Sequence, residues 1–227
     1  MSTPPAKPPL TVDILQSEAA TFSAIESIYP EPSLYGVTDG KAVGTYLEHK
    51  FRAYLETRYS FAPCNSASGV DFPELQVDMK VTSIKQPQSS CPFRSARQKI
   101  FGLGYALLVF VYDKTDDSKT TTSTLNILHT VFVEPHRTGD FQMTRLIRQM
   151  LENEAIAEDL VALMTDRNLP LDDVEASSIA DELLQKPPEQ GYLPIFNALR
   201  LQLQYKRVIT QAGNVEGIHE LRVDIPF

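Results

Sequence analysis

The chain has 227 residues, of which 42% are hydrophobic and 22% charged, and its net charge is −8. This length and composition are those of an ordinary globular protein with a substantial core. The two cysteines, Cys64 and Cys91, form no CxxC pair. Neither a disulfide nor a zinc site is therefore indicated, and reduced thiols in a cytoplasm are expected.

The first ten residues, MSTPPAKPPL, carry four prolines and no apolar segment. They predict a disordered tail over residues 1–10 rather than a signal peptide. The apolar run Ala106–Tyr112 is seven residues long and too short to span a bilayer. We therefore expect a soluble, cytoplasmic protein with no membrane partner.

Two helices are predicted in the first 60 residues. The first covers about Thr11 to Ile28 and ends before Pro30. The second covers Lys41 to Tyr59. Its apolar residues recur every four positions and form one stripe, which consists of Val43, Leu47, Phe51 and Leu55.

A strand is predicted between Val70 and Ile84, where apolar and polar residues alternate strictly. The apolar positions are Leu75, Val77, Met79 and Val81, and the polar ones are Gln76, Asp78, Lys80 and Thr82. Period two indicates one face on the core and the other in a cleft. A loop over Lys85–Phe93 and a short helix over Ser95–Phe101 are expected next.

The rest of the chain predicts two core strands and a helical segment. Ala106–Tyr112 is typical of a buried central strand and Thr124–Val133 of its neighbour, joined by a polar connection. Gly139–Leu203 is predicted to be mostly helical. Two strand-like runs follow within Leu201–Asp224. This order indicates a mixed α/β protein with one central sheet.

The run from Asp71 to Lys80 carries a candidate hydrolytic site. Asp78 and Lys80 are two apart on a strand and so point to the same side, and a turn at Pro73 can return Asp71 to Asp78. Two carboxylates can share Mg²⁺, with the Met79 carbonyl as a third oxygen. Lys80 would orient the water that attacks a phosphodiester. The alternative is a solvated strand face.

This run, DFPELQVDMK, resembles the hairpin of the PD-(D/E)xK nucleases, which have the restriction-endonuclease-like fold. It is most similar to the branch of the mismatch-repair nicking endonuclease and related restriction enzymes. Asp71, Asp78 and Lys80 match the metal-binding acids and the lysine of that motif, whereas Val70 stands where its name has proline.

The preceding segment GKAVGTYLEHKF resembles the first core helix of these nucleases, with Glu48 at its acidic position. The resemblance implies that Glu48 assists Asp71, Asp78 and Lys80 in catalysis. From the residues alone, Glu48 would instead pair with Arg52 at i, i+4 on a helix surface.

The resemblance implies an α/β fold, in which a central mixed β-sheet is flanked by helices and extended by an added helical segment. One nuclease domain is expected over residues 11–227. Its catalytic core covers about 40–133, its helical elaboration about 139–203 and its C-terminal strands about 204–224.

The function implied is that of a type II restriction enzyme. Such an enzyme cuts double-stranded DNA at a specific sequence, requires Mg²⁺ and leaves 5′-phosphate ends. A homodimer is expected because a twofold DNA site matches a twofold protein, and a cognate DNA methyltransferase is expected in the same system. The alternatives are a repair nickase or junction resolvase of the same fold, or a non-catalytic DNA-binding or interaction module.

The charges are unevenly distributed, which bears on DNA binding. Met79–Tyr112 contains no acid and five bases, whereas Leu151–Glu189 contains eleven acids and two bases. In the basic stretch, Gln and Arg can read base edges, while Ser and Lys can contact phosphates. The alternative is a polar surface loop. The candidate DNA contacts are Lys85, Gln86, Gln88, Ser89, Ser90, Arg94, Arg97 and Lys99.

Overall fold

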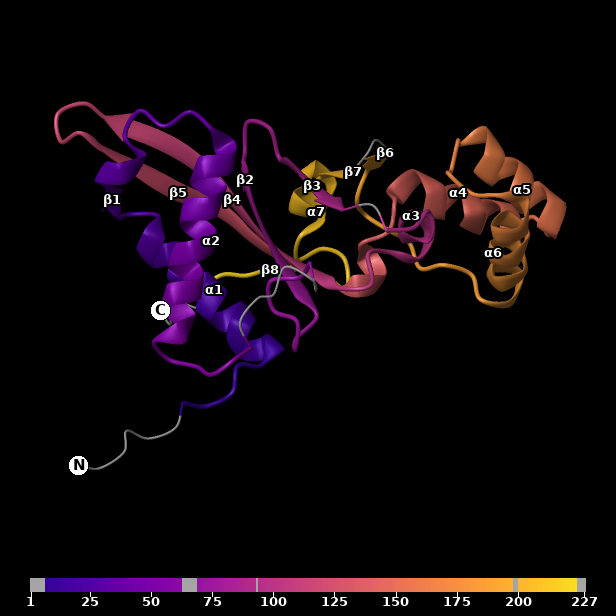
Figure 1. Cartoon of the computed structure of the whole chain (residues 1–227), viewed down its shortest axis with the longest axis horizontal. Helices are drawn as coiled ribbons and strands as arrows, with labels where there is room; N and C mark the ends of the chain where they lie inside the picture. Colours follow the sequence, from indigo (N-terminus) through magenta and orange to yellow (C-terminus); the bar gives the residue numbers. More distant parts are fainter. Residues whose placement is uncertain (1–6, 63–68, 93, 198–199, 224–227) are drawn as a thin grey trace. The chain divides into compact units, whose positions relative to one another are not determined.

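The computed structural model of the chain describes residues 7–62, 69–92, 94–197 and 200–223. These residues form two compact units (Figure 1). The first unit comprises the described residues of Met1–Ser89, Ala106–Val133 and Gln211–Phe227, and the second those of Ser90–Tyr105 and Glu134–Thr210. No helix in these ranges is long and apolar enough to cross a membrane. Cys64 lies outside the described residues.

A mixed five-stranded sheet forms the centre of the first unit. Its order is β1-β5-β4-β2, and β8 also pairs with β5. β2 is parallel to β4, while β4, β1 and β8 are each antiparallel to β5. The predicted central mixed sheet is therefore confirmed. The strands are β1 (Pro30–Glu31), β2 (Val77–Ser83), β4 (Ala106–Asp117), β5 (Thr122–Val133) and β8 (Ile218–Glu220).

Two helices, α1 (Val12–Glu26) and α2 (Gly40–Glu56), pack against this sheet, α1 on β5 and α2 on β2 (Figure 1). A 3-10 turn, η1 (Pro32–Leu34), lies between them. The predicted stripe of α2 is fully buried and contacts Phe22 and Phe110 in the core. Burial of this stripe fixes which flanks of α2 carry its polar residues.

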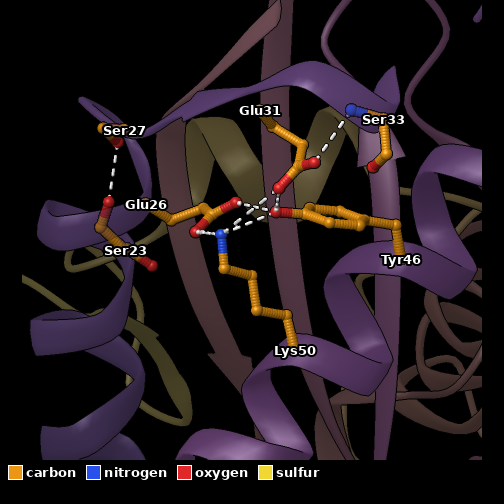
Figure 2. A network of polar contacts seen from close by, with 7 residues as sticks. All are labelled: Ser23, Glu26, Ser27, Glu31, Ser33, Tyr46 and Lys50. Carbon is orange, nitrogen blue, oxygen red and sulfur yellow. Dashed lines mark hydrogen bonds and ion pairs between the residues drawn. The ribbon is translucent and has the colours of Figure 1, made fainter.

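One of these flanks holds a polar network at the end of α1 (Figure 2). The ammonium of Lys50 lies 2.8 Å from the Glu26 carboxylate and donates a 2.6 Å hydrogen bond to the Tyr46 hydroxyl. That hydroxyl lies 2.7 Å from Glu31 and 3.2 Å from Glu26. The Glu26 side chain is only 2% exposed. The network therefore joins α1 and β1 to α2 at a buried position.

β4 and β5 extend beyond the predicted core strands into the segment expected as a polar connection. The two strands stay paired as far as Asp117 and Thr122. The Ser123 hydroxyl donates a 2.6 Å hydrogen bond to Asp116 across the ladder. Because this extension is largely polar, its sequence lacks the apolar run that indicates a core strand.

The described part of the second unit contains five helices and a small sheet with the order β3-β7-β6. The last residue of α7 and the first two residues of β3 belong to the first unit. Its core is formed by α3 to α6, including Ile100, Ile147 and Ile179. A 3-10 turn, η2 (Pro135–Arg137), precedes α4. The elements are α3 (Arg97–Phe101), α4 (Phe141–Glu152), α5 (Ala157–Asp166), α6 (Asp173–Gln185), α7 (Lys206–Gln211), β3 (Gln88–Pro92), β6 (Ile195–Asn197) and β7 (Arg200–Gln204).

Three predictions for this part of the chain were wrong. Residues 88–92 form β3 rather than a loop, and residues 195–197 and 200 lie in strands β6 and β7 rather than at the end of a helical segment. Lys206–Gln211 is a helix within the region expected to hold strands. β3 and β7 pair over more than 100 residues of sequence, and such distant pairing leaves no local periodic signal.

Candidate active site

A tight turn returns Asp71 to β2. Phe72 and Val77 form an antiparallel bridge in which each amide donates to the other's carbonyl, at 2.9 and 3.2 Å. Gln76 closes the turn with a φ of +52°. The amide of Met79 donates a 2.9 Å hydrogen bond to Oδ2 of Asp71. The predicted return of Asp71 to the strand is thus present.

Asp78 and Lys80 lie side by side on β2, as period two predicts. The Lys80 ammonium is 2.7 Å from Oδ2 of Asp78, and the two side chains are 19% and 5% exposed. Burial raises the pKa of Asp78; Lys80 opposes the rise, and contact with the Asp71 carboxyl adds to it. Burial lowers the pKa of Lys80, but the charge and hydrogen bond of Asp78 and the charges of Asp71 and Glu48 together outweigh burial, so the pKa is raised overall.

α2 contributes Glu48 to the same cluster. Burial raises the pKa of Glu48 to about 7. The negative charges of Asp71 and Asp78 raise the pKa as well, while the positive charges of Lys80 and Arg52 lower it. Gly44, one turn earlier, faces Val81, where an added Cβ would lie 3.8 Å away. A glycine at this position lets α2 approach β2 closely.

Arg52 is the site residue whose role the sequence did not predict. Its guanidinium pairs with Asp71, with 2.9 Å between Nη2 and Oδ1, rather than with Glu48. It also lies 5.6 Å from the centroid of the Phe72 ring. Arg52 and the Met79 amide together hold both oxygens of Asp71. Its place one turn after Glu48 was the available signal, because that spacing puts both on one flank of α2.

The oxygens of this cluster suit a hard cation. Within the described ranges, no group of three or more His, Cys, Asp or Glu side chains is arranged to hold a metal. Two carboxyls, those of Asp71 and Asp78, nevertheless lie next to each other. Two carboxylates are sufficient because Mg²⁺ is commonly bound through one or two carboxylates together with substrate phosphates and water. The arrangement therefore fits a cation shared between the protein and a phosphate group.

Three of the predicted DNA contacts, Lys85, Gln86 and Gln88, line a groove of about 640 Å³ in the first unit. The groove lies where α2 begins and β2 ends, and Lys41 and Tyr112 also line it. Lys85 is 75% exposed and lies 3.4 Å from Asp113. The groove thus reaches Val81, the residue of β2 that Gly44 faces.

The other predicted contacts have different surroundings. Ser89 and Ser90 lie in β3, and Arg94 is exposed just after it. Arg97 pairs with Glu182 at 2.6 Å and lies over the Phe101 ring. Lys99 lines a pocket in the second unit. These positions leave DNA contact by the eight residues as a prediction.

The similarity of this chain to known proteins extends beyond the hairpin. A family model described as "Type II restriction enzyme NspV" matches residues 9–220. The type II restriction enzyme NspV of Nostoc sp. is 66% identical over 209 residues, which are 92% of this chain and 95% of that protein. No solved structure matches the chain. The predicted similarity to restriction enzymes is confirmed, and this chain belongs to the NspV family of type II restriction enzymes.

Proposed function

We propose that the chain hydrolyses phosphodiester bonds of double-stranded DNA with Asp71, Asp78, Lys80 and Glu48, in a Mg²⁺-dependent reaction. The observation that carries the proposal is the hairpin, which brings the carboxyl of Asp71 beside Asp78 and the ammonium of Lys80 within 2.7 Å of Asp78. A solvated strand face could also carry the pair of Asp78 and Lys80. It would not carry Asp71, which the turn brings back to the strand and which has the Met79 amide and the Arg52 guanidinium as partners.

Asp71, Asp78 and the carbonyl of Met79 would hold the Mg²⁺. When bound, it supplies charge neutralisation at the phosphate and a more acidic water. The raised pKa values of Asp78 and Glu48 support this assignment, because buried, crowded carboxylates gain from a neighbouring cation. Arg52 keeps Asp71 oriented toward the hairpin.

Lys80 and Glu48 would act on the water and the phosphate. Lys80, held by Asp78, would donate to the attacking water or to a phosphate oxygen and offset the negative charge that develops there. Glu48, with a pKa of about 7, can accept a proton near neutral pH. The products would carry 5′-phosphate and 3′-hydroxyl ends, as the resemblance to PD-(D/E)xK nucleases implies.

The groove of Lys41, Lys85, Gln86 and Gln88 would contact the DNA strand next to the cleaved bond. Lysines can neutralise phosphates there, and glutamine amides can pair with adenine edges. We also propose that the enzyme acts as a homodimer in a cytoplasm, with a methyltransferase that protects the host sequence.

The test is the variant Asp78→Asn, which keeps the shape of the side chain but removes its charge. With Mg²⁺ and phage DNA, the wild-type chain should give discrete fragments and Asp78→Asn none. Binding to the duplex should survive or tighten, because a negative charge near the phosphates is lost. Asp117→Asn, an exposed acid at the far end of β4, is the control and should cut normally. Wild-type cleavage by Asp78→Asn would remove Asp78 from the site.

A further inference from the structure

A small pocket in the second unit has two cations in its wall. Its volume is about 220 Å³. Lys99 of α3 and Arg167, which directly follows α5, both line it. The rest of the wall comes from α4 and the start of β6, and consists of Asp140, Gln142, Met143, Pro194, Ile195 and Phe196.

The wall of this pocket carries more positive than negative charges. Among the described residues, neither Lys99 nor Arg167 forms an ion pair, whereas the nearby Arg97 pairs with Glu182. The acid of the pocket, Asp140, is 7% exposed. Its two oxygens accept hydrogen bonds from the backbone amides of Met143 and Ile195, at 2.8 and 2.7 Å. Two bases against this one acid leave the pocket positive.

The two cations also disfavour each other. Burial lowers the pKa of Lys99, the charge of Asp140 opposes this, and the charge of Arg167 has a smaller effect that lowers the pKa. An anion between them would relieve this repulsion, and an arginine can bind a phosphate with two parallel hydrogen bonds. Phe196, which is 54% exposed, offers an apolar surface beside the cations against which a deoxyribose can pack.

We infer that this pocket binds one phosphodiester group of the DNA substrate between Lys99 and Arg167. The inference rests on the proposed function in taking DNA as the substrate. It adds Arg167, which lies in the acid-rich stretch Leu151–Glu189 and was not among the predicted contacts. In the second unit, a phosphate held here would fix the backbone of the duplex without reading its bases.

The first experiment measures the affinity of the whole chain for a duplex that contains one mapped cleavage site. Fluorescence anisotropy is recorded in EDTA at several salt concentrations. Arg167→Gln and Lys99→Gln should each bind about tenfold more weakly and lower the slope of log Kd against log salt by about one unit. Arg167→Lys should recover part of the loss. Lys186→Gln, an exposed lysine of the same unit, is the matched control and should bind as the wild type.

The second experiment replaces single phosphates of the duplex by neutral methylphosphonates. At one phosphate position, the methylphosphonate should weaken binding of the wild-type chain but not of Arg167→Gln. The variant already lacks the guanidinium that contacts this phosphate, so neutralising the phosphate has no further effect. Arg167 is exposed, so this variant should fold with the wild-type Tm.

Two results would overturn the inference. One is wild-type affinity and salt slope in Arg167→Gln. The other is a methylphosphonate scan that is the same in wild type and Arg167→Gln. Cleavage of phage DNA is scored separately with Asp78→Asn, which does not touch this pocket. Failure of the phosphate-binding test therefore does not affect the assignment of the hydrolytic residues. Cleavage by Asp78→Asn likewise does not affect the inference about the pocket.

Discussion

Lys80 is the residue whose removal should separate DNA binding from cleavage. Its ammonium is held 2.7 Å from Asp78 and is the cation of the hairpin. Lys80→Ala should slow cleavage at least ~100-fold, the low end expected when a charge-stabilising or proton-transfer group is lost. Single-turnover rates at saturating enzyme measure this step without the contribution of binding. A rate within about threefold of the wild type would exclude Lys80 from the chemistry.

Glu48 should make the metal-free protein less stable as the pH rises. Its pKa in the fold is about 7, above the ordinary value of 4.5, so folding favours the protonated form. The stabilisation is present below about pH 4.5 and is lost as the pH rises through 7. Glu48→Gln, which resembles the protonated side chain, should therefore melt a few degrees above the wild type at pH 8.

The same comparison at pH 5 provides the control. In EDTA, the difference in Tm between Glu48→Gln and the wild type should be small at pH 5 and grow steadily to pH 8. A difference that does not change with pH would mean that Glu48 ionises without cost in the fold, against the crowding described for it.

The sequence predicts the acids and the lysine of the site but not all of their partners. Asp78 and Lys80 follow from period two, and Asp71 from the turn at Pro73, because both rules act within ten residues. Arg52 was missed because its pairing with Asp71 depends on a contact between two separate segments. Side-chain pairing across elements is set by packing, which a local pattern does not report.

At the scale of elements, the network of Figure 2 should hold α2 in place over the sheet. Lys50→Met would leave the carboxylate of Glu26 buried without its cation and should cost about 2–3 kcal/mol of unfolding free energy. Urea denaturation at pH 7 measures the loss. Lys41→Met, at the exposed start of the same helix, should change stability by less than ~0.5 kcal/mol.

The double variant Lys50→Met/Glu26→Gln tests the reason for that loss. Removing the buried charge together with its partner should restore part of the stability, because the cost comes mainly from the unpaired carboxylate. A double variant that is as unstable as the sum of the two single variants would mean that the two side chains stabilise the fold independently.

The elements that the sequence predicted well are those with one strongly apolar side. α2 and β2 show helical and strand periodicity over Val43–Leu55 and Leu75–Thr82, and α1 ends before Pro30 as predicted. β3, β6 and β7 are five residues or shorter and pair across distant segments, so no periodic run marks them. The polar ends of β4 and β5 are ordered by their ladder rather than by a buried face.

At the scale of the whole molecule, the family match covers residues 9–220 and therefore both compact units. Sequence-specific cleavage thus belongs to the chain as a whole, although the motif that first indicated it lies within the first unit. The net charge of −8 gave no sign of a DNA-binding protein. The distribution of bases predicted Lys99 as a DNA contact, but not Arg167, whose contact is proposed from the pocket, because an arginine among acids carries no local charge signal.

A chain that cuts a symmetric DNA site should bind it as a homodimer. Each half of a twofold site presents the same bases to one copy of the chain, and each copy carries one hairpin for one strand. In sedimentation velocity with Ca²⁺ replacing Mg²⁺, the complex with a duplex bearing one site should contain two chains of 25.4 kDa. A wild-type chain mixed with excess Asp78→Asn should then yield mainly nicked DNA, because mixed dimers cut one strand. One chain per duplex, together with a nick in a fixed strand by the pure wild-type protein, would instead identify a monomeric nickase.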